Sequence, residues 1–279
     1  TGRVTQCPGA QFVVNGSSSV VGEVRGFDVR VDVTNMSIPE MNPAEGWLGD
    51  ALDAIIEDYD PRGMMDMQIH ARRGPDGELT YEGEITPKNM TVCYKHFPIE
   101  VDDVTGAIKF DQTGIGEIYM TGQRDDMRLD LAGSARKSAE KFWLYDVELH
   151  ASNVPLDRTV KDALPRRMIA VWDTLNPEGS TAVRVRAKRL ETGAKTLSVT
   201  LDFKGQAAIT YENFPYRLES LFGTVSLVDD EVHIDRTMPL RGSHGMAACT
   251  IYGDVTELNS DSAVVDLIIE TRRVEIDDD

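Results

Sequence analysis

Hydrophobic residues alternate with polar ones in two stretches of the chain that are similar to each other. The first stretch runs from Thr91 to Asp111, and the second runs from Thr210 to Val228. Both contain a tyrosine, a Phe-Pro pair and a glycine in the same register, with apolar residues at every second position. Such alternation places one set of side chains on one face of a β-strand. We therefore predict an internal repeat built from one-sided strands.

The repeat extends beyond these two stretches and divides the whole chain. Residues 127–133 correspond to residues 247–253 at a slightly larger spacing, which indicates a short insertion in the second copy. The sequence thus has the pattern of a segment from a longer array. The predicted divisions are the tail of a preceding repeat (1–26), a first complete repeat (27–141), a second complete repeat (142–262) and the start of a following repeat (263–279).

Each complete repeat also contains one stretch with helical periodicity. Trp47–Tyr59 and Pro165–Leu175 carry apolar residues three or four positions apart, and a turn with proline and glycine follows each of them. Asp157 precedes a further helical turn and is a suitable N-cap for it. We expect one short helix per repeat, lying against the apolar face of the sheet and partly filling it.

The other connections are short, so successive strands should pair in an antiparallel manner. The predicted fold class is mainly β: an extended, twisted antiparallel sheet of tandem repeats that forms an apolar groove, with one short helical insertion per repeat. A one-residue error in register would move a strand's apolar set to the other face. The predicted lining of the groove is Val92, Tyr94, Ile99, Val101, Ile108, Phe110, Ile209, Tyr211, Tyr216, Leu218, Val225 and Leu227.

The charge of the chain narrows the classes of partner. A net charge of −18 and only 29 scattered basic residues argue against a nucleic-acid surface, because binding phosphates requires clustered Lys and Arg.

The three cysteines, Cys7, Cys93 and Cys249, lie in strand patterns without close spacing. We expect buried free thiols, and a Cys7–Cys249 or intermolecular disulfide remains open.

The sequence contains little that indicates catalysis. The five histidines are far apart, and none has the spacing of a metal-binding motif. Gly242-Ser243-His244-Gly245 lacks the G-x-S-x-G pattern of a nucleophile elbow, and the acidic clusters lack calcium-loop spacing. We therefore expect a protein that is not an enzyme and that carries no cofactor or metal.

Several short motifs together resemble the repeats of the AsmA-like family of bridge-like lipid transfer proteins, the group that includes TamB and YhdP. The motifs are Asn-Val-Pro-Leu-Asp (153–157), Ala-Leu-Pro (163–165), Leu-Asn-Pro-Glu-Gly (175–179), Tyr-x-x-Phe-Pro (211–215) and Leu-x-x-x-x-Gly-Thr-Val (218–225). The resemblance implies the periplasmic part of an inner-membrane-anchored envelope protein, with its anchor outside this chain. Its β-groove would bind phospholipid or another acyl lipid for transport between the inner and outer membranes, in outer-membrane biogenesis. The implied partners are neighbouring repeats of the same chain and an outer-membrane or envelope protein.

A second interpretation follows from the same periodicity. The apolar faces could be entirely internal, as in the closed core of a structural or adhesive β-repeat module. Such a module would use its exposed surface to bind a protein partner. Bound acyl lipid distinguishes the first interpretation from the second.

Overall fold

The computed structural model describes residues 9–21, 24–38, 57–74, 76–140, 142–164, 166–211, 216–257 and 264–272. The contacts between residues divide the chain into two compact units, which we treat separately. Unit 1 comprises Thr1–Asp125, Asp130–Val147 and Arg189–Gly193. Unit 2 comprises Asp126–Leu129, Glu148–Lys188 and Ala194–Asp279.

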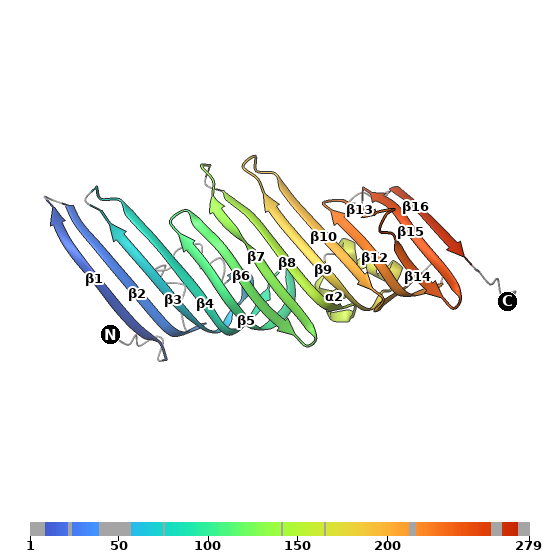
Figure 1. Cartoon of the computed structure of the whole chain (residues 1–279), viewed down its shortest axis with the longest axis horizontal. Coiled ribbons are helices and arrows are strands. Elements are labelled where there is room, and N and C mark those ends of the chain that lie inside the picture. The colour runs from blue at the N-terminus through green and yellow to red at the C-terminus, as the bar shows by residue number, and fades with distance from the viewer. Residues whose placement is uncertain are drawn as a thin grey trace. The chain divides into compact units, whose positions relative to one another are not determined.

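The strands form one antiparallel sheet, which confirms the predicted mainly β class (Figure 1). The described residues contribute sixteen strands to it, and β1 to β10 follow one another in chain order. The strands of unit 1 are β1 (Gln11–Val21), β2 (Val24–Ile38), β3 (Arg62–Arg73), β4 (Leu79–Tyr94), β5 (Phe97–Asp111) and β6 (Gly114–Arg124). Residues of β7 (Met127–Lys137) and β8 (Trp143–Pro155) are divided between the units.

The described part of unit 2 contains two helices and strands of four to twelve residues. After α2 (Arg158–Ala163) and α3 (Arg166–Leu175), its elements are β9 (Glu178–Arg189), β10 (Lys195–Lys204), β11 (Ala207–Thr210), β12 (Arg217–Val228), β13 (Glu231–Ile234), β14 (Leu240–His244), β15 (Ala247–Thr256) and β16 (Val264–Arg272). β11 pairs with both β12 and β9, and β16 pairs with β15.

The insertion predicted for the second copy interrupts a strand. β13 and β14 both pair with β12 on one side and with β15 on the other, so together they occupy one position in the sheet. Between them, Asp235 accepts hydrogen bonds from the backbone N–H and the hydroxyl of Thr237, both at 2.6 Å. The extra residues lie in this turn, so β12 and β15 still flank a single position of the sheet.

The helical region of the second repeat consists of two helices, where the sequence predicted a turn capped by Asp157 and a helix from Pro165. Asp157 caps α2 as expected, since its Oδ1 accepts a hydrogen bond from the Val160 N–H at 3.0 Å. Leu164 then has an extended backbone, with φ −72° and ψ 150°, as is common for a residue that precedes proline. The helix therefore stops and restarts as α3. Of the predicted helix Trp47–Tyr59, only residues 57–59 are described, and they are helical; the remainder lies outside the described residues.

Backbone features recur in the two units in the same order. Left-handed backbone occurs at Asp103 and Ser220, with φ of 52° and 50°. Three residues further on, Gly106 and Gly223 have φ of 131° and 124°, and a Cβ on either would collide with a neighbouring carbonyl oxygen. These recurrences agree with an internal repeat, while the boundaries of the repeats remain a prediction.

Candidate functional site

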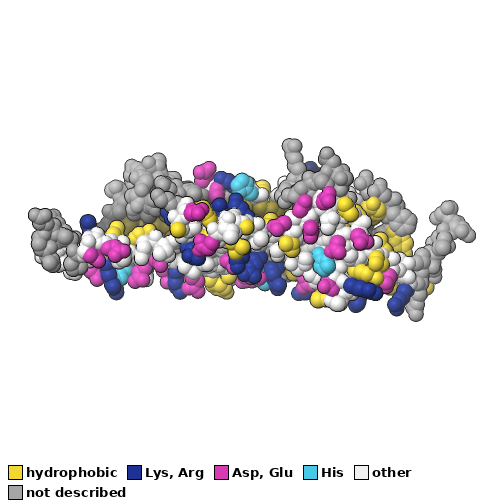
Figure 2. Space-filling model, turned by 90° about the horizontal axis from the view of Figure 1, so that it is seen from above, with side chains coloured by type: hydrophobic (Ala, Val, Ile, Leu, Met, Phe, Trp, Pro, Cys, Tyr) yellow, Lys and Arg dark blue, Asp and Glu magenta, His cyan; other side chains and the backbone are white. Residues whose placement is uncertain are grey.

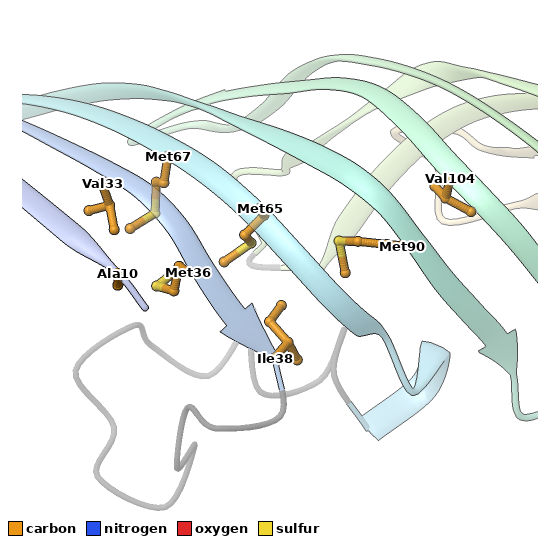
Figure 3. Close-up of a cluster of buried hydrophobic side chains, with 8 residues drawn as sticks. All are labelled: Ala10, Val33, Met36, Ile38, Met65, Met67, Met90 and Val104. Carbon is orange, nitrogen blue, oxygen red and sulfur yellow. The ribbon is translucent and has the colours of Figure 1, made fainter. Parts of the chain in front are cut away.

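Unit 1 has one sheet face formed by hydrophobic side chains from six strands and from Ala10. We call this the apolar face of unit 1. Eight of its side chains are at most 6% exposed, and Figure 3 shows them gathered on one side of the strands. These eight are Ala10, Val33, Met36, Ile38, Met65, Met67, Met90 and Val104. Seven partly buried residues pack against them: Phe12, Val31, Ile69, Ile85, Val92, Val101 and Met120.

The strand register makes this face continuous. Val33 lies opposite Met67 on the next strand, and Met67 lies opposite Ile85 on the strand after that. Directly opposed residues of antiparallel strands point to the same side of the sheet. The same rule places Ile108 on the apolar face, because it lies opposite Ile85.

Three residues with left-handed backbone interrupt the strict alternation along these strands. They are Asn35, Asn89 and Asp103, and irregularities of register coincide with each. An extra residue in a strand shifts all later side chains to the opposite face. The apolar spacing therefore changes at these points, so that Val104 follows Val101 on the same side.

Polar groups stabilise the bulge in β2. Asn35 donates its backbone N–H to Asp66 at 2.9 Å, and Lys88 Nζ lies 3.0 Å from Asn35 Oδ1 and 2.7 Å from Asp66 Oδ2. Partial burial of Asp66 disfavours its charged form, but the hydrogen bonds from Lys88 and Asn35 outweigh this effect and lower its pKa. The bulge in β2 is thus held by contacts to the adjacent strand β3 and to β4 beyond it.

The opposite face of unit 1 is polar. Lys109 pairs with Glu117 at 2.7 Å across β5 and β6, and His70 Nε2 lies 2.8 Å from Asp28 Oδ1 across β2 and β3. Hydrogen bonding to Glu117 raises the pKa of Lys109. Figure 2 shows acidic and basic side chains interspersed on the surface that it presents. The strands of unit 1 are therefore amphipathic.

The predicted lining residues of unit 1 lie on the apolar face or at its end. Val92 and Val101 are opposite each other, and the ring of Phe110 lies over Gly83, its partner on β4. Ile99 precedes Val101 by two positions and is 6% exposed. Tyr94 ends β4 and is 38% exposed.

Tyr94 contacts the described end of the first helical segment. Its ring stacks on Tyr59 with centroids 4.9 Å apart. Lys95 donates its backbone N–H to the Asp58 carbonyl at 2.8 Å, and its ammonium group pairs with the Asp58 carboxylate at 2.5 Å. These contacts hold residues 57–59 against the turn between β4 and β5.

Four of the six predicted lining residues of unit 2 gather in one cluster. We define the apolar face of unit 2 by its buried cluster and the residues packed on it; Ile209, Tyr216, Leu218 and Val225 belong to it. Leu227 lies two positions beyond Val225 and opposite Val199. Tyr211 is 42% exposed and is not part of the cluster. The Tyr216 ring lies 4.0 Å from the His244 ring, between centroids.

The predicted lining lacks three residues that are buried in these faces. Leu221 is 0% exposed, Val104 is 4% exposed and Met90 is 4% exposed. Strict alternation from Val101 or Leu218 assigns Val104 and Leu221 to the polar face. The available signal was the residue before each, Asp103 and Ser220, because small polar residues are over-represented where the backbone is left-handed.

The helices of unit 2 lie near its apolar face. Val160 and Ala163 of α2 are both 7% exposed, and α3 contacts β11, the strand that carries Ile209. That these helices partly fill a groove is still a prediction.

The described residues contain no constellation that indicates catalysis or metal binding. No group of three or more His, Cys, Asp or Glu within them could hold a metal ion. Cys93 and Cys249 are free thiols there, and burial raises the pKa of Cys249; Cys7 lies outside the described residues. In the same part of the chain, no helix has the length and apolar character needed to cross a membrane.

Comparison with known proteins gives no family for this chain. No family model matches the sequence, and neither a curated protein nor a solved structure matches it.

Proposed function

We propose that this chain is a non-enzymatic, lipid-binding segment of a cell-envelope protein that resembles the AsmA-like family. In this proposal the apolar faces of the two units hold the acyl chains of phospholipids. The observation that carries it is the amphipathic sheet of unit 1, in which one face is apolar from β1 to β6 while the other face is polar.

The chemistry of the apolar face supports an acyl ligand. Hydrophobic side chains from β1 to β6 pack side by side on the apolar face of unit 1. Burying one methylene group stabilises a complex by about 0.8 kcal/mol, and hydrocarbon contacts are not directional. An acyl chain could thus be bound without a fixed position along the strands.

Methionine is frequent on this face and favours a variable ligand. Met36, Met65, Met67 and Met90 lie in the buried cluster, and Met120 packs against it. Methionine is unbranched and polarisable, and it adapts to irregular shapes. Such a lining would tolerate acyl chains of different length and saturation.

The cellular setting is part of the same proposal. The chain would lie in the periplasm, attached to the inner membrane by a segment outside this chain, and would carry lipid between the inner and outer membranes. Neighbouring repeats would extend the apolar face, and an envelope or outer-membrane protein would receive the lipid.

One observation favours the alternative of a structural or adhesive module with a closed core. Met36 is 1% exposed and Leu221 is 0% exposed, which are values typical of a packed interior. The half-buried residues Ile69, Ile85 and Val101 would then be the rim of that core.

Native mass spectrometry of the chain, purified without detergent, tests the proposal. We expect bound phospholipid that survives gel filtration and can be exchanged for phospholipid from vesicles of phosphatidylethanolamine and phosphatidylglycerol. The matched control is the chain with Ile85→Asp and Val101→Asp, which places two charges on the apolar face of unit 1. Absence of lipid from the unmodified chain, before and after incubation with vesicles, would favour the structural module.

A further inference from the structure

Three strands end in a pair of basic residues. β3 ends in Arg72-Arg73, β7 ends in Arg136-Lys137, and β9 ends in Lys188-Arg189. These strands run in the same direction, because neighbouring strands of an antiparallel meander alternate in direction. The ends of β3 and β7 therefore lie along one edge of the sheet (Figure 1).

The second residue of each pair lies on the apolar side of its strand. On β3, Arg73 is four positions after Ile69, which packs on the apolar face of unit 1, so alternation returns its side chain to that side. On β7, Lys137 lies on the more buried side, since burial alternates along the strand. On β9, Arg189 continues the row of Val185. We call Arg73, Lys137 and Arg189, all of which belong to unit 1, the cationic rim.

The two sides of these strand ends differ in their charge partners. On the polar side, Arg72 Nε lies 3.3 Å from Asp28, and Arg136 Nη2 lies 2.7 Å from Glu191. The cationic rim forms no ion pair with any residue that the structure describes. Its charges are therefore free to bind an anionic ligand that lies on the apolar side.

Two cations of the rim lie on aromatic rings. Lys137 Nζ is 5.6 Å from the centroid of the Trp143 ring, and the guanidinium carbon of Arg189 is 4.4 Å from that of Phe142. A ring attracts a cation without neutralising its charge. Arg189 Nε is also buried and has no hydrogen-bond partner among the described residues. These groups can still donate charge-assisted hydrogen bonds to phosphate oxygens.

From this arrangement we propose that the cationic rim binds the phosphate groups of phospholipids whose acyl chains lie on the apolar side of the sheet. A lipid held at the rim would extend its acyl chains along the apolar row of the same strand. Neighbouring strands are about 4.8 Å apart, so Arg73 and Lys137, four strands apart, are about 19 Å apart and would bind separate phosphates. The inference rests on the lipid binding proposed above.

The choice between two lipids tests the inference. The chain is incubated with phosphatidylglycerol vesicles that contain a minority of diacylglycerol with the same acyl chains, and bound lipid is identified by native mass spectrometry. Arg73→Gln combined with Lys137→Gln should lower the ratio of bound phosphatidylglycerol to bound diacylglycerol about fivefold, the effect of losing an exposed charged contact. The matched control, Arg72→Gln combined with Arg136→Gln, changes the net charge equally on the polar side and should leave the ratio unchanged.

The outcomes separate this inference from lipid binding itself. An unchanged ratio in the rim variant, or an equal decrease in the control variant, would overturn the role of the cationic rim while lipid binding stands. Absence of both lipids from the unmodified chain would contradict lipid binding and the rim with it. If the double variant loses its melting transition, Arg73→Gln alone provides the comparison, because Arg73 is exposed and its described side-chain contact is one hydrogen bond to the Gly77 carbonyl, at 3.1 Å.

Free phosphate is the competing source of the anion. Because Lys137 lies on the Trp143 ring, a phosphate that binds Lys137 should change the fluorescence of Trp143, and Trp143→Phe should abolish this change. We expect phosphatidylglycerol vesicles to produce the change, and inorganic phosphate at the same phosphate concentration to produce none. An equal change with inorganic phosphate would assign the rim to a free ion and overturn the proposal of a lipid phosphate.

Discussion

Single residues with left-handed backbone determine which side chains reach the apolar faces. Asp103 in unit 1 and Ser220 in unit 2 have φ near +50° and directly precede Val104 and Leu221, which are among the most buried residues. Each adds one residue to its strand, so the next side chain turns to the apolar side. The composition of the face thus depends on backbone conformation as well as on alternation.

Substitutions at Asp103 test this requirement. Asp103→Gly should be more stable than Asp103→Val by about 1–2 kcal/mol, because a Cβ disfavours left-handed backbone and β-branching adds to the cost. Both variants lose the 2.6 Å hydrogen bond from Gln123 Nε2 to Asp103, so their difference reports the backbone alone. Urea unfolding measures it. Equal stability of the two variants would contradict the assignment of strain to this residue.

His233 predicts a pH dependence of stability in unit 2. It lies opposite Asp254 and close to Asp235, and hydrogen bonding to Asp254 raises its pKa from the ordinary value of 6.5. Because the folded pKa is the higher one, the stabilisation is complete below about pH 6.5 and is lost as the pH rises through the folded pKa. Thermal unfolding between pH 6 and 8.5 should show this loss in the unmodified chain.

The matched variant for this experiment is His233→Gln, which keeps a hydrogen-bond donor without the titration. Its melting temperature should fall less between pH 6 and 8.5 than that of the unmodified chain. Parallel curves for the two proteins over this range would show that the ion pair does not contribute.

At the scale of elements, the short helix α2 depends on its cap. It has six residues, so its unpaired N–H groups are a large fraction of its backbone donors. Asp157→Ala removes the acceptor for the Val160 N–H and should cost about 1 kcal/mol. The control is Asp162→Ala, which removes an exposed pair with Arg158 and should cost less than half as much. Equal losses in urea unfolding would contradict the role of the cap.

Alternation predicted the type of element better than its length. The alternating stretch read from the sequence begins at Thr91, whereas β4 runs without interruption from Leu79 to Tyr94. The bulge at Asn89 changes the apolar spacing, so a period of two cannot follow the strand through it. Asp157 and Pro165 contained the signals for a cap and for the start of a second helical segment, and the extended backbone of Leu164 separates the two helices.

Long-range pairing was the least predictable feature of the elements. A meander in chain order follows from short connections, and β1 to β10 obey it. The strands no longer follow the chain order where a turn formed by Asp235 and Thr237 divides one position of the sheet between β13 and β14. Nothing in the alternation of β13 and β14 shows that they share one position, since each strand alone is too short to have a period.

At the scale of the whole chain, the apolar faces of the two units differ in side-chain type. Four of the eight residues in the buried cluster of unit 1 are methionines, while the buried cluster of unit 2 consists of Phe203, Ala207, Leu218, Leu221, Ile234, Leu240 and Cys249. Flexible methionine side chains adapt to a ligand, whereas branched side chains pack against one another in defined rotamers. Under the lipid-binding proposal, we therefore expect unit 1 to tolerate a wider range of acyl chains than unit 2.

A charge placed on each apolar face separates a lipid-binding face from a closed core. Leu218 is 8% exposed and lies opposite Ile209, so Leu218→Asp buries a carboxylate and should cost several kcal/mol. Ile108 is only half-buried, opposite Ile85, and the carboxylate of Ile108→Asp can reach water. We expect Ile108→Asp to lower the melting temperature much less than Leu218→Asp, although it lies within the predicted lining.

Photo-crosslinking from the position of Val101 then tests whether Ile108 lies where the acyl chain binds. In the lipid-binding proposal, Ile108→Asp should sharply reduce crosslinks to phospholipid while the chain stays folded, because an ionised carboxylate on the face repels the acyl chain. The control Ala107→Asp introduces the same charge one residue away on the polar face, opposite Tyr119, and should leave crosslinking unchanged. If Ile108→Asp unfolds unit 1 and the unmodified chain yields no lipid crosslink, the apolar face is the core of a structural module.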